Sequence, residues 1–188
     1  MDLKQRINCF TLELYEESET LQFKNIINIV KSNEFYSCKW YYILHNKDIN
    51  ENGETKKAHY HLLVKLDNAI SIENIIKSLV NERGTSQAIE NDLSIVKSFK
   101  GCVRYLIHYD DKNKFQYNLN DIVSNDRNIS YYFNDNTIVE NFQLIVSIVK
   151  ENKINCMREL IYYCVENNNV IAMQYIQDNA YLVSCLFR

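Results

Sequence analysis

Hydrophobic and polar positions along the first two thirds of the chain follow two different periods. Alternating segments rich in aromatic and β-branched residues predict strands, whereas apolar residues three and four positions apart predict amphipathic helices. The expected strands are residues 8–15, 38–45, 58–66 and 86–89. The expected helices are residues 21–30, 71–80 and 96–109. This part of the chain therefore predicts a domain of mixed strands and helices.

The last third of the chain has a different pattern. Residues 118–136 are dense in Asn and Asp, which predicts a connecting segment with a short strand at 129–133. Three helical patterns follow, at residues 139–149, 154–164 and 172–183. They predict a small all-helical module at 136–188 after a first domain at 1–135. Its strongly apolar helix faces either cap the main domain or assemble with copies of themselves.

Composition narrows the class of protein. The 188-residue chain has no Pro and three Gly, which favours a folded domain over a disordered one. No segment is apolar enough for a membrane helix, and the polar start lacks a signal-peptide core, so we expect no membrane association. Six scattered cysteines without a Cys-x-x-Cys pair favour reduced thiols and a cytoplasmic location.

The four histidines are the most informative side chains. His59 and His61 flank Tyr60 in a predicted strand, and side chains two apart project from the same face of a strand. His45 and Asp48 come at the end of the preceding predicted strand. A lone His-x-His pair is more often a polar strand face than a metal site. Three imidazoles and a carboxylate together predict a metal site at His45, Asp48, His59 and His61.

Tyr105 lies on the predicted 96–109 helix, opposite the apolar side chains of that helix. Gly101, Arg104 and His108 share this polar face. A tyrosine there is usually a surface residue, but its basic neighbours would attract a phosphate. The net charge of −3 does not indicate nucleic-acid binding. Local clusters of basic residues are therefore more informative about such binding than the net charge. The candidate phosphate-binding residues are Lys56, Lys57, Lys97, Lys100 and Arg104.

Three of these segments occur in the order of a known set of motifs. Phe10-Thr11-Leu12 resembles a first-strand motif, His59-Tyr60-His61-Leu62-Leu63-Val64 a paired-histidine motif, and Val103-Arg104-Tyr105-Leu106-Ile107-His108 a nucleophile motif. Leu44-His45-Asn46-Lys47-Asp48 resembles an additional ligand segment. Over residues 8 to 120, the chain resembles the rolling-circle plasmid replication initiators (Rep proteins) of Gram-positive bacteria, within the HUH endonuclease superfamily. Many related initiators carry Lys where this chain has His108, so the role of that position stays open.

The resemblance implies a fold, an activity and partners. It implies an antiparallel sheet of four to five strands flanked by helices, the HUH nuclease fold, followed here by a helical oligomerisation module. It implies binding of the plasmid origin, single- and double-stranded, and nicking of one strand by Tyr105. The products would be a 5′-phosphotyrosine link and a free 3′-OH for the host replication machinery, with later rejoining of the strand. The cofactor would be a divalent metal, Mn²⁺ or Mg²⁺, with Mn²⁺ favoured by an imidazole-rich ligand set.

Two alternatives remain open on the sequence. One is a single-tyrosine HUH transposase or a viral-type initiator, which shares the paired histidines and the late tyrosine. The other is a non-enzymatic origin-binding regulator with a vestigial site. The site is complete, which argues against a vestigial one, because the chain retains His45, Asp48, His59, His61 and Tyr105. Tyr117 is a further candidate for the site, by loose positional resemblance.

Overall fold

The computed structural model describes residues 2–18, 21–32, 35–80 and 86–187. It divides into two compact units, Met1–Arg127 and Asn128–Arg188. The first unit contains β1 (Arg6–Leu14), α1 (Phe23–Lys31), β2 (Cys38–His45), β3 (His59–Ser71), α2 (Ile72–Leu79), α3 (Ser86–Asp92), β4 (Ser94–Ile95), α4 (Phe99–Tyr105), the 3₁₀ turn η1 (Leu119–Asp121) and β5 (Val123–Ser124). Among the described helices, none combines the length and the apolar character needed to cross a membrane.

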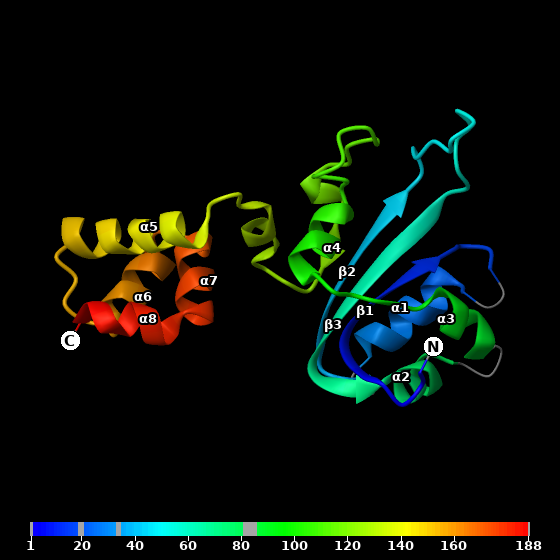
Figure 1. The fold of residues 1–188 in the computed structure, drawn as a ribbon, viewed down its shortest axis with the longest axis horizontal. Helices are drawn as coiled ribbons and strands as arrows, with labels where there is room; N and C mark the ends of the chain where they lie inside the picture. The colour runs from blue at the N-terminus through cyan, green and yellow to red at the C-terminus, as the bar shows by residue number, and fades with distance from the viewer. Residues whose placement is uncertain (1, 19–20, 33–34, 81–85, 188) are drawn as a thin grey trace. The chain divides into compact units, whose positions relative to one another are not determined.

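The first unit is built on one antiparallel sheet with the strand order β4-β1-β3-β2-β5. The long strand β3 lies at the centre, paired with β1 on one side and β2 on the other. Helices α1, α2 and α3 cover one face of the sheet, and α4 lies on the other (Figure 1). The predicted α+β class, with an antiparallel sheet, flanking helices and further helices at the C-terminal end, is confirmed.

Alternation along β3 separates a hydrophobic face of the sheet from a face that carries histidines. Leu62, Val64 and Leu66 are buried in the main hydrophobic cluster with side chains of α1, α2 and α3. His59 and His61 alternate with these residues and therefore face the side of α4. Pairing places His59 directly opposite His45 on β2. The hydrophobic core thus determines which face of the sheet carries the histidines.

Helix α4 is short, with a side-chain cap at its start and a series of turns directly after its end. Its first turn is capped by the Ser98 hydroxyl, which accepts a hydrogen bond from the Gly101 N–H at 3.2 Å. Val103 and Leu106 are buried beneath the helix. After Tyr105 the chain continues in turns, and His108 adopts a positive φ of 55°. The predicted helix over 96–109 is therefore too long at both ends.

Two short strands were predicted in the wrong places. Residues 86–89 belong to helix α3, and the fourth strand is Ser94–Ile95. Residues 129–133 form the 3₁₀ turn η2 (Ile129–Phe133), and the fifth strand is Val123–Ser124. Short apolar runs are ambiguous because β-propensity mostly measures packing against neighbouring strands. Strands of two residues carry almost no periodic signal.

The second unit is helical. It contains η2, α5 (Ile138–Glu151), α6 (Met157–Glu166), α7 (Val170–Asp178), α8 (Ala180–Ser184) and the 3₁₀ turn η3 (Cys185–Phe187). A reciprocal capping box starts α5, with the Thr137 hydroxyl accepting from the Glu140 N–H and the Glu140 carboxylate accepting from the Thr137 N–H. The expected helix at 172–183 is two helices, separated at Asn179.

The helical unit has a hydrophobic cluster of its own. Ile145, Leu160, Tyr175 and Val183 are each at most 1% exposed, and they come from four different helices. Helices α5 and α6 end before Lys153 and Asn168, which take the positive φ typical of helix C-termini. These turns reverse the chain so that successive helices bury their apolar faces against one another.

Candidate active site

Three imidazoles converge where β2 ends and β3 begins. The ring centroids of His45 and His61 are 4.5 Å apart, and those of His59 and His61 are 4.9 Å apart. The Nε2 atoms of His59 and His61 are separated by 3.2 Å. One ring nitrogen from each of the three histidines lies within 4.8 Å of the others, which is close enough to share one cation. Strand pairing produces this cluster, because His45 and His59 are register partners.

His45 is fully buried, and its two ring nitrogens have different environments. Nε2 lies 2.7 Å from the Leu106 carbonyl oxygen, so this nitrogen carries the proton and donates it. Nδ1 is then the atom with the free lone pair, 3.2 Å from Asp48 Oδ2. It has no hydrogen-bond partner among the described residues. A buried lone pair beside a carboxylate is the environment expected of a metal ligand.

His59 is oriented in the same way by the backbone. Its Nδ1 lies 2.8 Å from the Lys57 carbonyl oxygen and donates to it, which leaves the lone pair on Nε2, facing His61. Glu13 of β1 adds a carboxylate oxygen 3.9 Å from the same nitrogen. Each imidazole that donates to a carbonyl presents its other nitrogen to the cluster, as metal-bound histidines do.

The ionisation states of this cluster suit a cation. Burial, reinforced by the neighbouring histidines, lowers the pKa of His61 to about 3. Burial also lowers the pKa of His45. Burial opposes ionisation of Asp48, but His45 and the Tyr117 hydroxyl hold the pKa of that carboxyl below its usual range. Near neutral pH, His45 and His61 are therefore neutral imidazoles and Asp48 is an ionised carboxylate, the forms that bind metals.

His108 belongs to this site, although the helical pattern predicted it on the polar face of a helix beside Tyr105. It is 1% exposed, because the chain has left the helix and turned through a positive φ. Its Nδ1 lies 2.8 Å from the Phe115 carbonyl oxygen and donates to it, and its Nε2 lies 3.9 Å from Asp48 Oδ2. Together with His45 and Asp48, His108 makes a second group that could hold a metal ion.

Tyr117 links the elements around Asp48. Its hydroxyl donates to Asp48 Oδ1 at 3.0 Å and accepts from the Lys47 N–H at 2.9 Å. Its ring stacks on His45 at 4.4 Å between centroids, with an interplanar angle of 3°. Burial, with the Asp48 carboxylate, raises its pKa to about 12, so the phenol keeps its proton. Tyr117 therefore acts on the position of Asp48 and His45.

Tyr105 is the exposed member of the site. It is 45% exposed at the end of α4, and its ring meets His61 edge-on at 5.7 Å. The Lys114 amine donates to its hydroxyl oxygen at 3.1 Å and lies 4.7 Å from its ring centroid. Tyr105 borders a hollow of about 170 Å³ that is also lined by Asp48, His59 and His61. The phenol is thus open to a large substrate directly beside the buried imidazoles.

The predicted basic residues differ in their relation to this hollow. Lys56 and Lys57 line it, together with Lys114, which was not among the predicted phosphate contacts. Lys97 and Lys100 are exposed around the start of α4. Arg104 pairs with Asp110, with Nε 2.8 Å from Oδ2, and its guanidinium stacks on Tyr109. Lys114 was missed because its approach to Tyr105 depends on the loop after α4.

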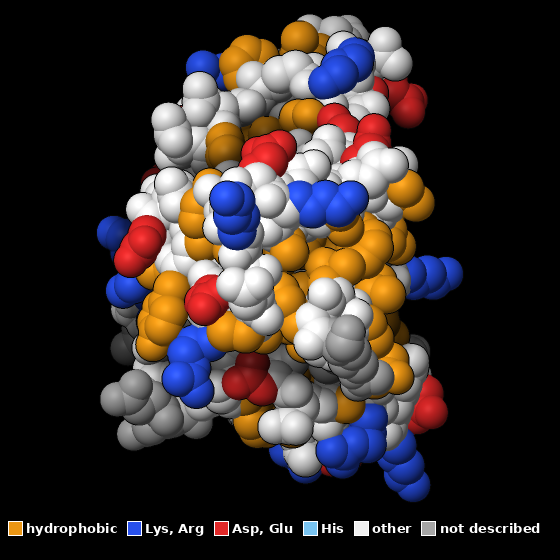
Figure 2. Space-filling model, turned by 90° about the vertical axis from the view of Figure 1, so that its left-hand side faces the viewer, with side chains coloured by type: hydrophobic (Ala, Val, Ile, Leu, Met, Phe, Trp, Pro, Cys, Tyr) orange, Lys and Arg blue, Asp and Glu red, His pale blue; other side chains and the backbone are white. Residues whose placement is uncertain are grey.

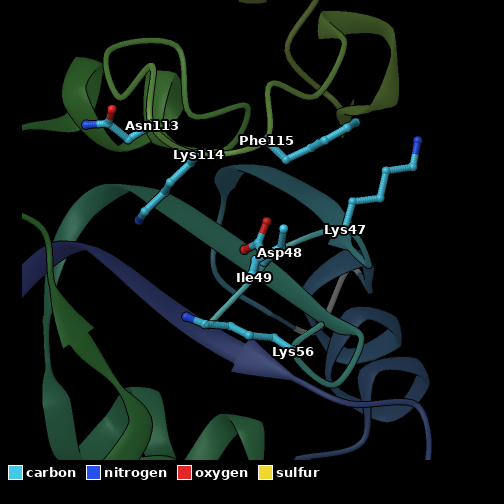
Figure 3. Close-up of a pocket in the computed structure, with 7 residues that line it drawn as sticks. All are labelled: Lys47, Asp48, Ile49, Lys56, Asn113, Lys114 and Phe115. Carbon is cyan, nitrogen blue, oxygen red and sulfur yellow. The ribbon is translucent and has the colours of Figure 1, made fainter. Parts of the chain in front are cut away.

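A second hollow adjoins the first. It has a volume of about 270 Å³, and Figure 3 shows the loop bearing Asn113, Lys114 and Phe115 above Asp48 and Ile49. Asp48, Lys56 and Lys114 line both hollows. The histidine cluster and the tyrosine therefore lie at one end of a continuous, lysine-rimmed surface.

An antiparallel sheet that carries a buried histidine cluster beside an exposed tyrosine and lysines suits a protein acting on nucleic acid. The family described as "Plasmid replication protein, origin binding domain" matches residues 2–130. Since this is well over half of the chain, the chain belongs to that family, and the expected relationship to plasmid replication proteins is confirmed.

Two curated relatives agree with this assignment. The chain is 39% identical over 80 residues to a "Replication protein" of Staphylococcus aureus, covering 43% of this chain and 37% of that protein. It is 38% identical over 79 residues to "Replication protein RepB" of Lactiplantibacillus plantarum, covering 42% of this chain and 34% of that protein. The alignments thus span little more than a third of the length of these relatives.

The buried imidazoles predict an acid-sensitive fold. The pKa of His61 is about 3 when folded, below the ordinary value of 6.5, so between these values the unfolded chain binds more protons. Stability from this residue is present above about pH 6.5 and is lost as the pH falls towards about 3. In chelator-treated protein, His61→Asn should weaken the pH dependence of urea unfolding by up to about 1.4 kcal/mol per pH unit. If the free energy of unfolding changed equally with pH in the wild type and the variant, the low pKa of folded His61 would be contradicted.

Proposed function

We propose that this chain initiates plasmid replication by binding the origin and nicking one DNA strand, with Tyr105 as the nucleophile. The observation that carries this proposal is the position of Tyr105, half exposed and edge-on to His61 of the buried histidine cluster. The membership in the origin-binding family supports the DNA substrate. It also favours a replication initiator over the transposase and over a viral-type protein.

The reaction would be a transesterification. The Tyr105 hydroxyl oxygen attacks the scissile phosphorus, the bond from phosphorus to the 3′ oxygen breaks, and a tyrosyl–phosphate bond forms. The phenol proton is released, and the departing 3′ oxygen takes up a proton. At the nick, one end of the cleaved strand then carries the 5′-phosphotyrosine link. The other end of the same strand has a free 3′-OH, which host replication enzymes would extend. The same steps in reverse rejoin the strand.

Lys114 would assist the nucleophile. Its ammonium already donates to the Tyr105 oxygen at 3.1 Å, so it would stabilise negative charge that develops there as the proton leaves. Lys114 is also paired with Asp111 at 4.0 Å, which keeps the amine near the tyrosine. Lys56 and Lys57, which also line the hollow, would hold the phosphates that flank the scissile bond.

His45, Asp48, His59 and His61 would hold a divalent cation, which would polarise the scissile phosphate when bound. Among the described residues the buried Nδ1 of His45 has no hydrogen-bond partner, which supports this ligand set. The Lys57 carbonyl, which directs the lone pair of His59 inwards, supports it as well. Because the set is rich in imidazole, it favours Mn²⁺ over Mg²⁺ in affinity. Lys97, Lys100 and Arg104 remain candidates for more distant phosphate contacts, and Arg104 would have to exchange Asp110 for DNA.

The helical unit would serve assembly. Figure 2 shows hydrophobic side chains gathered on the surface of one face. The large hydrophobic side chains that are exposed among the described residues of this unit are Ile138, Val139, Tyr162, Val165, Tyr181 and Leu182. A second copy of the chain would bury such surface, and several linked copies would bind repeated origin sites more tightly through multivalency. We therefore propose a homo-oligomer formed through residues 136–188.

Tyr105→Phe tests the nucleophile. The variant should form no covalent adduct with single-stranded origin DNA in the presence of Mn²⁺, because it lacks the attacking oxygen. Its DNA affinity should change little, since the aromatic ring is kept. Adducts that survive denaturation are resolved by gel electrophoresis, with Tyr109→Phe, four residues along, as the matched control. A denaturation-resistant adduct in the Tyr105 variant would refute the assignment.

His59→Ala and His61→Ala test the cation site. Each should weaken Mn²⁺ binding by at least tenfold and abolish nicking, since each removes one of three clustered imidazoles. Calorimetric titration with Mn²⁺ measures affinity without DNA or turnover, and circular dichroism checks the fold. Wild-type affinity in the double variant would exclude these histidines as ligands.

Substitution on the helical unit tests assembly. The full-length protein should associate at micromolar concentration in sedimentation experiments, and Val165→Lys together with Tyr181→Lys should shift it towards monomer. Both side chains are at least 60% exposed, so the fold should tolerate the change. Val123→Lys, at an exposed site in the first unit, is the control. A wild-type protein that stayed strictly monomeric in these experiments would exclude the proposed homo-oligomer.

A further inference from the structure

We propose that the 270 Å³ hollow beside the tyrosine binds one unpaired nucleobase of the cleaved strand, with Phe115 as its stacking platform. The proposal rests on the nicking function above and adds a subsite to it. The base would belong to a nucleotide adjoining the phosphate that Tyr105 attacks.

The position of the hollow supports this assignment. Lys114 reaches the Tyr105 hydroxyl at 3.1 Å and also lines the second hollow, as do Asp48 and Lys56. A strand whose phosphate lies against Tyr105 would therefore bring a neighbouring nucleoside directly to this space. The volume falls just below the roughly 300–1,000 Å³ of sites that enclose drug-sized ligands. It thus suits one base, while the sugar and phosphates stay outside.

The lining has the chemistry of a base-stacking site. Phe115 and Ile49 are 42% and 63% exposed, although both are large and apolar. Lys47, Lys56 and Lys114 accompany them, and Figure 3 shows these lysines around the hollow. An exposed aromatic ring among cations is how proteins bind single-stranded nucleic acid, because the ring stacks on the base and the amines attract phosphates.

The platform is held in place before DNA arrives. The Phe115 carbonyl oxygen accepts from His108 Nδ1 at 2.8 Å, which ties the loop to the histidine cluster. The Gln116 side-chain amide donates to the carbonyls of His108, Asp111 and Lys114. Tyr117 fixes the opposite wall through the Lys47 N–H and Asp48. Little ordering of the protein is therefore required when a base enters.

In the absence of DNA, the Lys47 amine covers the aromatic ring of Phe115. This amine lies 4.7 Å from the centroid of Phe115, a cation–π contact. An entering base would replace the ammonium on the ring, and the released amine would pair with a phosphate. Bases in an intact duplex are stacked on their neighbours, so the hollow would select a strand that is already unpaired.

Binding of two matched probes tests the proposal without any cleavage. The probes are a single-stranded oligothymidylate 12-mer and an abasic 12-mer with the same sugar–phosphate backbone. Full-length wild-type protein should bind oligothymidylate more tightly than the abasic strand, and Phe115→Ala should lower the oligothymidylate affinity by about 5- to 100-fold. The same substitution should leave the affinity for the abasic strand nearly unchanged. Fluorescence anisotropy measures all four affinities at one salt concentration.

Two further variants distinguish stacking on an aromatic ring from contact with any apolar side chain of similar size. Phe115→Tyr should keep the preference for bases because it keeps a ring, whereas Phe115→Leu should lose it while keeping an apolar side chain. A Phe115→Ala protein with the full wild-type preference would overturn the proposal, as would a wild-type protein without one. Because no outcome depends on a covalent adduct, failure of this subsite is distinguishable from failure of the Tyr105 assignment.

Discussion

The hydrogen bond from His45 to the Leu106 carbonyl is the contact on which the geometry of the site depends. At 2.7 Å and fully buried, it joins the end of β2 to the residue that follows Tyr105. It fixes which nitrogen of His45 carries the proton, and therefore which lone pair faces Asp48. Because the bond is out of water, breaking it would leave a polar group unpaired, so the position of the tyrosine relative to the histidines is held firmly.

The sheet supplies a rigid frame for this bond. One face buries aliphatic side chains against three helices, and that burial sets the alternation of β3. The other face can then carry His59 and His61 without loss of the core, and Val103 of α4 and Leu106, directly after that helix, are buried as well. Polar groups on a buried sheet face are costly unless they are satisfied. Here carbonyls of Lys57, Leu106 and Phe115 each accept from one imidazole and leave the other nitrogen available.

Basic side chains are concentrated near the candidate site, although the net charge of the chain is −3. Lysines from the β2–β3 hairpin and from the loop after α4 line the two hollows beside the histidine cluster. Acidic side chains near them are engaged, with Asp48 held by Tyr117 and Asp110 paired with Arg104. Such a local cluster of lysines would attract and orient the DNA strand of the proposed function, because local charge matters more for this than the net charge.

The sequence by itself determined the mixed α+β class, the main strands and the candidate site residues His45, Asp48, His59, His61 and Tyr105. The bounds of β2 and the placement of His59 and His61 on one face of β3 agree with period-two alternation, which a buried sheet face imposes on the residues. Only the tertiary structure decided the parts that depend on turns. His108 enters the site through one positive φ, and Lys114, Phe115 and Tyr117 reach it on an irregular loop. Such positions leave no periodic signal, because they are set by contacts between segments far apart along the chain rather than by the repeat of a helix or a strand.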